Sequence, residues 1–176
     1  GAMTNHYIDL QHADVILIQG SNMAEHHPVA MKWALRAQEK GAKIIHVDPR
    51  YTRTSAKADV YCRLRSGTDI AFLGGMINYI IENERYFKEY VENYTNALFK
   101  VPDSYSFNDG LFVGYDPATR KYNTTLWKIH RDSNNIAEKA SSLDDPDSVF
   151  QKLKEHYSRY TPEKVSAITG TPVEDL

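Results

Sequence analysis

The sequence has a single cysteine, Cys62, among its 176 residues. One thiol cannot close a disulfide within the chain, and it excludes an iron–sulfur cluster or an all-cysteine zinc site held by this chain alone. Long apolar runs are also missing, so no stretch is long enough to cross a bilayer. The net charge of −2 lacks the basic surplus typical of nucleic-acid-binding proteins. We therefore expect no nucleic-acid partner and no direct insertion into a membrane.

Short strands alternate with helices in the first hundred residues. The first strand, Val15 to Ile18, is apolar on both faces, which predicts a strand buried on both sides. Pro28 suits the first position of a helix and Gly41 its end. The strands are expected at 14–19, 43–47 and 60–64, and the main helices at 28–40 and 69–83. This alternation predicts an α/β fold, with a Rossmann-like parallel sheet and flanking helices.

The composition changes near Lys100, where Tyr, Asn, Asp, Gly and Ser become frequent. The stretch 111–129 predicts a β-hairpin around Asp116-Pro117-Ala118-Thr119. Helical patterns return after about residue 147, and the chain ends at the start of a further helix, as a piece of a longer polypeptide would. The predicted organisation is a Rossmann-like nucleotide-binding domain at 1–100, a hairpin-containing insertion at 101–145 and a truncated helical return segment of the same domain at 146–176.

Three loops follow the predicted strands and carry polar residues suited to a nucleotide. In an open parallel sheet, ligands bind beyond the carboxyl ends of the strands, which share one edge. The candidate residues are Gly20, Ser21, Asn22 and Glu25 in the first loop, Asp48, Arg50 and Thr52 in the second, and Ser66, Gly67 and Asp69 in the third.

Each loop offers a different part of nucleotide recognition. Gly20 lets a phosphate approach the main chain, with donors from the next two residues and the start of the following helix. Asp48 suits ribose hydroxyls, and Arg50 can pair with phosphate or stack on a base. The carboxylate of Asp69 offers two acceptors to the two adjacent N–H donors of guanine, which adenine lacks.

Each loop also has a purely structural interpretation. The glycine can be a plain turn, Asp-Pro-Arg a strand terminator, and Ser-Gly-Thr-Asp a helix cap. His26 and His27 are adjacent and point about 100° apart on a helix, so they do not form a metal-binding pair. Cys62 lies among strand residues and is expected to be a packed side chain rather than a nucleophile. We therefore assign no metal ligand and no catalytic residue.

Taken together, three motifs carry a family resemblance: G-S-N-M-A-E-H-H-P at 20–28, D-P-R-Y-T-R-T at 48–54 and S-G-T-D at 66–69. The chain closely resembles the molybdopterin-dependent oxidoreductases of the dimethyl-sulfoxide-reductase family. "YTNALFKV", "DGLFVGYDPATRKYN" and "HYSRYTPEKVSAITGTP" extend the resemblance over essentially the whole chain. The segment 110–122 favours the branch of the large catalytic subunits of respiratory formate dehydrogenases. The first motif is also close to that of periplasmic nitrate reductase, and a free-standing nucleotide-binding or assembly module is a third alternative.

The resemblance implies a bis(molybdopterin guanine dinucleotide) cofactor with molybdenum or tungsten, of which this chain would hold one arm. By resemblance, the first loop borders the pyrophosphate and pterin, the second meets the ribose and a phosphate, and the third holds the guanine. The iron–sulfur cluster and the cysteine or selenocysteine metal ligand would belong to other parts of the parent. We therefore expect the chain alone to be inactive, whereas the parent oxidises formate to carbon dioxide.

The resemblance also implies partners and a location. The partners would be the rest of the catalytic subunit and an iron–sulfur electron-transfer subunit of an anaerobic respiratory chain. Enzymes of this branch are usually exported folded, so the periplasm is expected, with the cytoplasm as the alternative.

Overall fold

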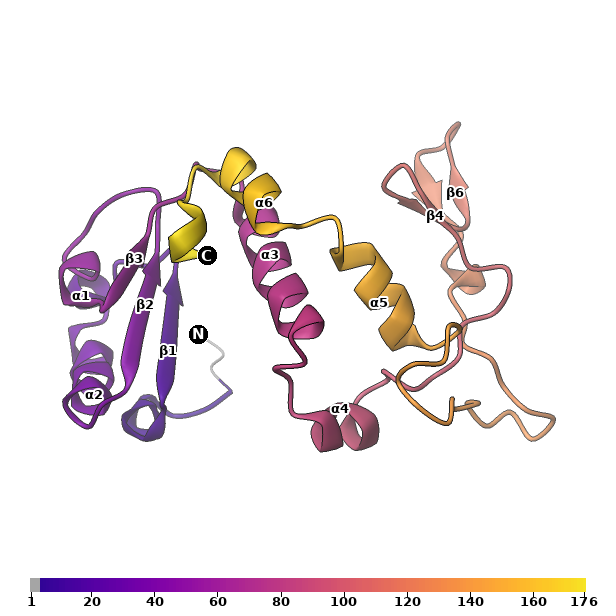
Figure 1. Ribbon diagram of the computed structural model, residues 1–176, viewed down its shortest axis with the longest axis horizontal. Coiled ribbons are helices and arrows are strands. Elements are labelled where there is room, and N and C mark those ends of the chain that lie inside the picture. Colours follow the sequence, from indigo (N-terminus) through magenta and orange to yellow (C-terminus); the bar gives the residue numbers. More distant parts are fainter. Residues whose placement is uncertain (1–3) are drawn as a thin grey trace. The chain divides into compact units, whose positions relative to one another are not determined.

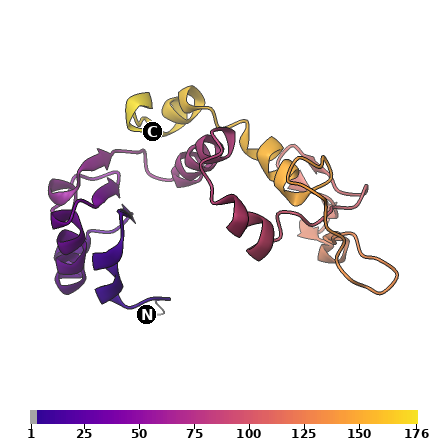
Figure 2. The ribbon, with the colours of Figure 1, turned by 60° about the horizontal axis from the view of Figure 1, so that its bottom comes forward.

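The computed structural model describes residues 4–176, which form two compact units (Figures 1 and 2). The first comprises the residues up to Ile77 together with Tyr160–Leu176, and the second comprises Asn78–Arg159. The domain boundaries predicted near residues 100 and 145 both fall inside the second unit. Each unit is described by itself below. Within residues 4–176, no helix is both long and apolar enough to cross a membrane.

The first unit contains a three-stranded parallel sheet in the order β1-β2-β3. The strands are β1 (Val15–Gln19), β2 (Lys43–Val47) and β3 (Val60–Cys62). The helices of this unit are η1 (Tyr7–His12), α1 (Met23–His26), α2 (Pro28–Glu39), η2 (Ser55–Lys57), the first part of α3 (Asp69–Glu82), α6 (Pro162–Thr169) and η4 (Val173–Asp175). The chain is thus a mixed α/β protein with a parallel sheet and helices.

Two apolar clusters pack on opposite faces of the sheet, as the two-residue period of a strand requires. On one face, α2 covers β1 and β2 (Figure 1), and the buried cluster contains Ile16, Ile18, Met31, Ala34, Ala37, Ala42 and Ile44. On the other face, the cluster contains Val47, Cys62, Leu64 and Phe72. The central strand β2 contributes to both clusters, so both faces of the unit depend on it.

The prediction that the first strand is buried on both faces is wrong. Val15 is 58% exposed and Leu17 is 40% exposed, whereas Ile16 and Ile18 are buried. The cause is the position of β1 at the edge of the sheet. The second cluster is built from residues of β2, β3, the segment just after β3 and α3, and it contains no residue of β1.

The second unit contains α4 (Lys88–Tyr94), η3 (Thr124–Leu126), α5 (Val149–Tyr157) and two short antiparallel strand pairs. The pairs are β4 (Phe107–Asn108) with β5 (Leu111–Phe112), and β6 (Tyr115–Asp116) with β7 (Lys121–Tyr122). The strands β6 and β7 pair across the predicted turn at Asp116-Pro117-Ala118-Thr119, so a hairpin forms there, but its strands are much shorter than the stretch 111–129. Gly114 separates the two pairs at φ +87°, and the carbonyl oxygen of Asn123 lies 2.8 Å from where a Cβ would be. The turn there needs a residue without a side chain.

Helices α3 and α6 approach closely within the first unit because α3 carries two adjacent glycines. A Cβ on Gly74 would lie 2.9 Å from the ring of Tyr160, and a Cβ on Gly75 would lie 2.9 Å from Cγ2 of Val165. Val165 is fully buried. Because its side chain is β-branched and stiff, it has little room to move away.

We predict that Gly75→Ala destabilises the chain, although alanine is the better helix former by about 1 kcal/mol. Overpacking a filled core costs about 1–3 kcal/mol, so we expect a net loss of about 1 kcal/mol. Urea unfolding measures it. Val165→Ala should cost less in the Gly75→Ala background than in the wild type, because it relieves the clash. A stabilising Gly75→Ala would contradict the close approach.

Candidate functional site

The three candidate loops begin at one edge of the sheet. The strands pair in parallel register, Gln19 with Val47 and Val47 with Cys62, so all three end at the same level. The Gly20 N–H donates to the Val47 carbonyl at 2.9 Å and so continues the ladder into the first loop. The first and second loops are therefore held side by side by backbone bonds.

A hollow of about 490 Å³ opens between the first two loops, lined by Asn22, Glu25, Arg50, Tyr51, Thr52, Arg53 and Ala56. Four of the ten predicted residues thus share one concave surface. Glu25 pairs with Arg53, with Oε1 and Nε 3.2 Å apart. Arg50 and Arg53 bring two guanidinium groups to the hollow, which suits a phosphate or pyrophosphate.

Asn22 braces the first loop instead of pointing donors at a ligand. Its side chain is buried. The amide nitrogen donates to Glu25, and the amide oxygen accepts from the Thr54 hydroxyl at 3.1 Å. The Thr54 oxygen also accepts from the Ala24 N–H at 2.9 Å. The helix that follows this loop, α1, is four residues long, so its dipole contributes little to an anion site.

The second loop is shaped by bonds around Asp48. The Oδ1 atom of Asp48 accepts from the Arg50 N–H at 2.8 Å, and the Tyr61 hydroxyl donates to the Asp48 carbonyl at 2.9 Å. Further along, the Thr52 N–H donates to the Ser55 hydroxyl at 2.8 Å. These local bonds fix the course of the chain as it leaves β2.

His46, on strand β2, is hydrogen-bonded to both the first and the second loop. Its ring is fully buried, with Nδ1 2.8 Å from Ser55 Oγ and Nε2 3.2 Å from the Ser21 carbonyl oxygen. A carbonyl can only accept, so Nε2 carries a proton. The Ser55 oxygen already accepts from the Thr52 N–H, and its own proton is available to Nδ1. The neutral imidazole therefore satisfies every partner, and it is a positioning residue for both loops.

Burial lowers the pKa of His46 below its usual value of 6.5, although the Ser21 carbonyl and the charge of Asp48 act in the opposite direction. The rings of Tyr61 and His46 stack with centroids 5.9 Å apart. The buried environment thus keeps the imidazole in the neutral form that the hydrogen bonds require.

The third loop joins the site through one side-chain contact. Asp69 opens α3, and its Oδ1 atom accepts from the Gln19 Nε2 at 2.9 Å. Ser66 and Gly67 are exposed, and Gly67 has φ +82°. The three predicted residues of this loop do not line the hollow between the first two loops. The structure brings Asp69 to the end of β1, however, so all three loops meet at that edge.

Sequence reasoning missed several residues that hold the site together, namely Gln19, His46, Arg53, Thr54 and Ser55. His46, Thr54 and Ser55 are buried polar residues. Polar residues at such positions in a core pattern are a signal for a hydrogen-bonded network, but their partners lie up to 32 residues away in sequence. Local patterns cannot supply those pairings.

The described part of the chain holds no group of three or more His, Cys, Asp or Glu that could bind a metal ion. Cys62 is buried, and its thiol donates to the Asp175 carbonyl at 3.2 Å. Burial, with the charge of Asp175, raises the pKa of this thiol to about 11. A protonated, enclosed thiol is a poor nucleophile.

Comparison with known proteins identifies the family. The family model for molybdopterin oxidoreductases matches residues 1–158. The chain belongs to this family. It is 58% identical over 99% of its length to the formate dehydrogenase subunit alpha of Megalodesulfovibrio gigas. It is 52% identical over its whole length to the formate dehydrogenase 2 subunit alpha of Nitratidesulfovibrio vulgaris, and 49% identical over 98% to the formate dehydrogenase-O major subunit of Escherichia coli.

The chain spans 17% of the length of each of these three relatives. Among solved structures, acetylene hydratase from Pelobacter acetylenicus matches 96% of the chain, with a TM-score of 0.57 and 26% identity, and the chain covers 18% of that structure. The same backbone arrangement therefore occurs in proteins whose names describe different reactions.

We predict that the free energy of unfolding falls as the pH drops below about 6.5. Because the folded pKa of His46 is lowered, the unfolded chain takes up the proton first, and stability is lost until the pH reaches the folded pKa. The slope contributed by one such histidine is at most about 1.4 kcal/mol per pH unit. Urea unfolding at a series of pH values measures it.

The matched variants are His46→Gln, which can donate to Ser21 and accept from Ser55, and His26→Gln at an exposed position. The first should flatten the pH profile and the second should leave it unchanged. Nitrogen NMR shifts should also show the Nε2–H tautomer of His46. An unchanged slope in His46→Gln would rule out its titration as the cause.

We predict that Cys62 in the folded chain reacts with a disulfide reagent at pH 8 far more slowly than in the urea-unfolded chain. A pKa of about 11 leaves roughly one thiol in a thousand ionised at that pH. Stopped-flow absorbance compares the two rates. Equal rates would contradict the burial of this thiol.

Proposed function

We propose that the chain holds one guanine dinucleotide arm of a bis(molybdopterin guanine dinucleotide) cofactor in the catalytic subunit of a formate dehydrogenase. The observation that carries this is the meeting of three loops at one sheet edge. Around it lie the hollow with two arginines and the carboxylate of Asp69. The formate dehydrogenase names of relatives 49–58% identical over nearly the whole chain support the same assignment.

The residues at this edge fit the cofactor arm. Gly20 and Gly67 have positive φ, and no atom lies within 4 Å of where their Cβ would be, so a ligand can approach both backbones. Arg50 at the hollow suits a phosphate, Asp48 at the end of β2 suits a ribose, and Asp69 suits the two N–H groups of guanine. The residues proposed to contact the cofactor arm also include Ser21, Glu25, Thr52 and Ser66.

When bound, the molybdenum or tungsten centre supplies the two-electron chemistry by which the parent would oxidise formate to carbon dioxide. The residues of this chain bind and orient one arm, and the chain alone is inactive. The iron–sulfur cluster, the metal ligand, the rest of the catalytic subunit and the electron-transfer subunit lie outside these residues. A periplasmic location in an anaerobic respiratory chain remains a prediction.

The same proposal includes the finer architecture. We interpret the three-stranded sheet as part of a Rossmann-like nucleotide-binding domain, and 101–145 as a hairpin-containing insertion into it. Parallel strands with ligand loops at their carboxyl ends support this interpretation. A nitrate reductase parent is the alternative, since the first motif fits it too. The printed names of the similar relatives favour formate.

We predict that GMP shifts the amide NMR signals of Gly20, Asp48 and Gly67 more than AMP does. Binding should be weak, in the millimolar range, because one arm of a two-armed cofactor lacks the effective concentration that the second supplies. Asp69→Asn should weaken GMP binding about tenfold or more, because charge-assisted hydrogen bonds are worth about 1.5–3 kcal/mol. The matched control is Asp14→Asn, an exposed carboxyl just before β1 that should not matter. Equal shifts with AMP and GMP would contradict the assignment of Asp69.

A further inference from the structure

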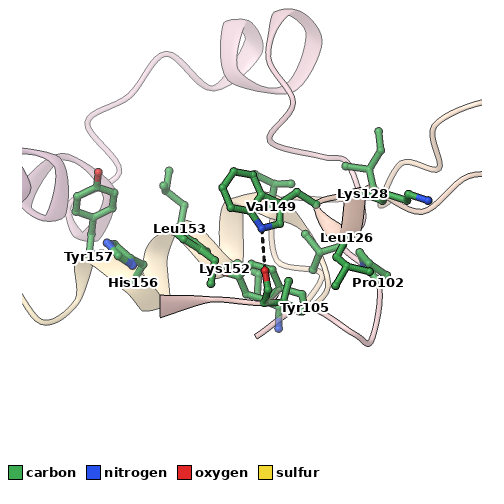
Figure 3. Close-up of a pocket in the computed structure, with 14 residues that line it drawn as sticks. Pro102, Tyr105, Leu126, Lys128, Val149, Lys152, Leu153, His156 and Tyr157 are labelled. Atoms are coloured by element: carbon green, nitrogen blue, oxygen red, sulfur yellow. Dashed lines mark hydrogen bonds between the residues drawn. The ribbon is translucent and has the colours of Figure 1, made fainter. Parts of the chain in front are cut away.

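The second unit carries an apolar groove that takes no part in the proposed cofactor site. It encloses about 440 Å³ and lies between α5 and the segments near residues 101–105, 112–113 and 126–129 (Figure 3). The side chains that matter most are Tyr105, Phe112, Leu126, Trp127, Val149 and Leu153. This volume is within the range of ligand pockets, about 300–1,000 Å³.

The walls of the groove are held in place by specific contacts. The Trp127 indole N–H donates to the Val113 carbonyl at 2.9 Å, marked by the dashed line in Figure 3. Phe112 packs against Trp127 with ring centroids 6.0 Å apart. Phe107 lies 4.8 Å from the ring of His156 and so connects the first strand pair to α5. The groove is therefore formed before anything binds in it.

The groove leaves large apolar side chains in contact with water. Trp127 is 50% exposed, Leu126 is 43% exposed, and Phe112 and Leu153 are each 41% exposed. Aromatic anchors around a concave apolar surface are typical of the centres of protein interfaces. A contiguous apolar surface of this kind marks an interaction site.

The charged side chains that line the groove are lysines. Lys128 and Lys152 are among the lining residues, and none of the fourteen lining residues is acidic. Arg159 and Glu155 lie together in an adjoining hollow, which shares Tyr105, Lys152 and His156 with the groove. A partner that presents a carboxylate next to an apolar side chain would complement both the apolar floor and the two lysines.

We propose that this groove is the docking surface for an apolar, carboxylate-bearing segment of the parent catalytic subunit that lies outside these 176 residues. The relatives are about six times longer than the stretch they share with this chain, so most of their length is available to supply it. The inference rests on the proposed function only in taking the chain as part of that subunit. Guanine binding at the first unit tests the cofactor assignment separately.

The test places a charge in the groove in two contexts. Leu153→Glu, and as a matched control Lys154→Glu on the same helix, are made in this chain. Glutamate is also placed at the positions aligned with Leu153 and Lys154 in the Megalodesulfovibrio gigas formate dehydrogenase subunit alpha. Both side chains are exposed in the isolated chain, so each variant should shift its melting temperature by less than about 2 °C.

In the longer subunit, glutamate at the position of Leu153 should lower the melting temperature by several degrees, because an unpaired charge would be buried. Glutamate at the position of Lys154, the control, should not lower the melting temperature of the subunit in this way. Failure to obtain soluble subunit with the first substitution alone counts as the same result. Hydroxyl-radical footprinting of the unmodified subunit gives a second measure. Positions aligned with Phe112, Leu126 and Trp127 should be roughly an order of magnitude less reactive than in the isolated chain.

Equal reactivity in the two contexts, or equal melting temperatures for the two glutamate variants of the subunit, would overturn the proposal. Sedimentation of the isolated chain provides a further check. If it forms dimers that Leu153→Glu dissociates, the groove binds a second copy and the proposed occupant is wrong.

Discussion

The parallel pairing of β2 with both neighbours is the constraint on which the rest of the first unit depends. Because β2 lies between β1 and β3 in register, the ends of all three strands reach one level. The Gly20 N–H extends this pairing by binding the Val47 carbonyl. The same strand supplies Ile44 to one buried cluster and Val47 to the other. The position of β2 therefore determines both the packing of the two buried clusters and the place where the three loops meet, at the carboxyl ends of the strands.

A buried polar network then determines the shape of that edge. Asn22, His46, Thr54 and Ser55 are all buried, and they connect the two loops through the Thr54–Asn22 hydrogen bond and through His46, which lies between Ser21 and Ser55. Within the described residues, no buried side-chain nitrogen or oxygen lacks a partner. A satisfied network of this kind is rigid, since moving one loop would leave a buried group unpaired at a cost of about 1–3 kcal/mol. The loops are therefore preorganised, which reduces the entropic cost of binding a ligand there.

The sequence was sufficient for the strands of the parallel sheet and insufficient for the contacts between distant elements. Short apolar runs bounded by polar and turn residues located all three strands of the sheet to within two residues. The contact of Gln19 with Asp69 spans 50 positions, and no local pattern specifies such a pair. The exposure of Val15 and Leu17 was also missed, since an apolar run does not reveal whether a strand is central or at an edge.

The exposed apolar side chains in the two units reduce the hydrophobic contribution to the stability of the chain. Burial of a side chain such as Val15 or Leu17 contributes about 1.5–3 kcal/mol, and both are left partly in water at the edge of the sheet. In the second unit, the side chains of Trp127 and Leu153 are also left partly exposed to water. The net stability of a domain is only about 5–15 kcal/mol, so four such side chains are a substantial part of it. Apolar residues at uncovered positions in both units agree with the fact that the chain spans only 17% of the length of its relatives. In the proposed parent subunit, covering these surfaces and binding the cofactor would stabilise the same folded state.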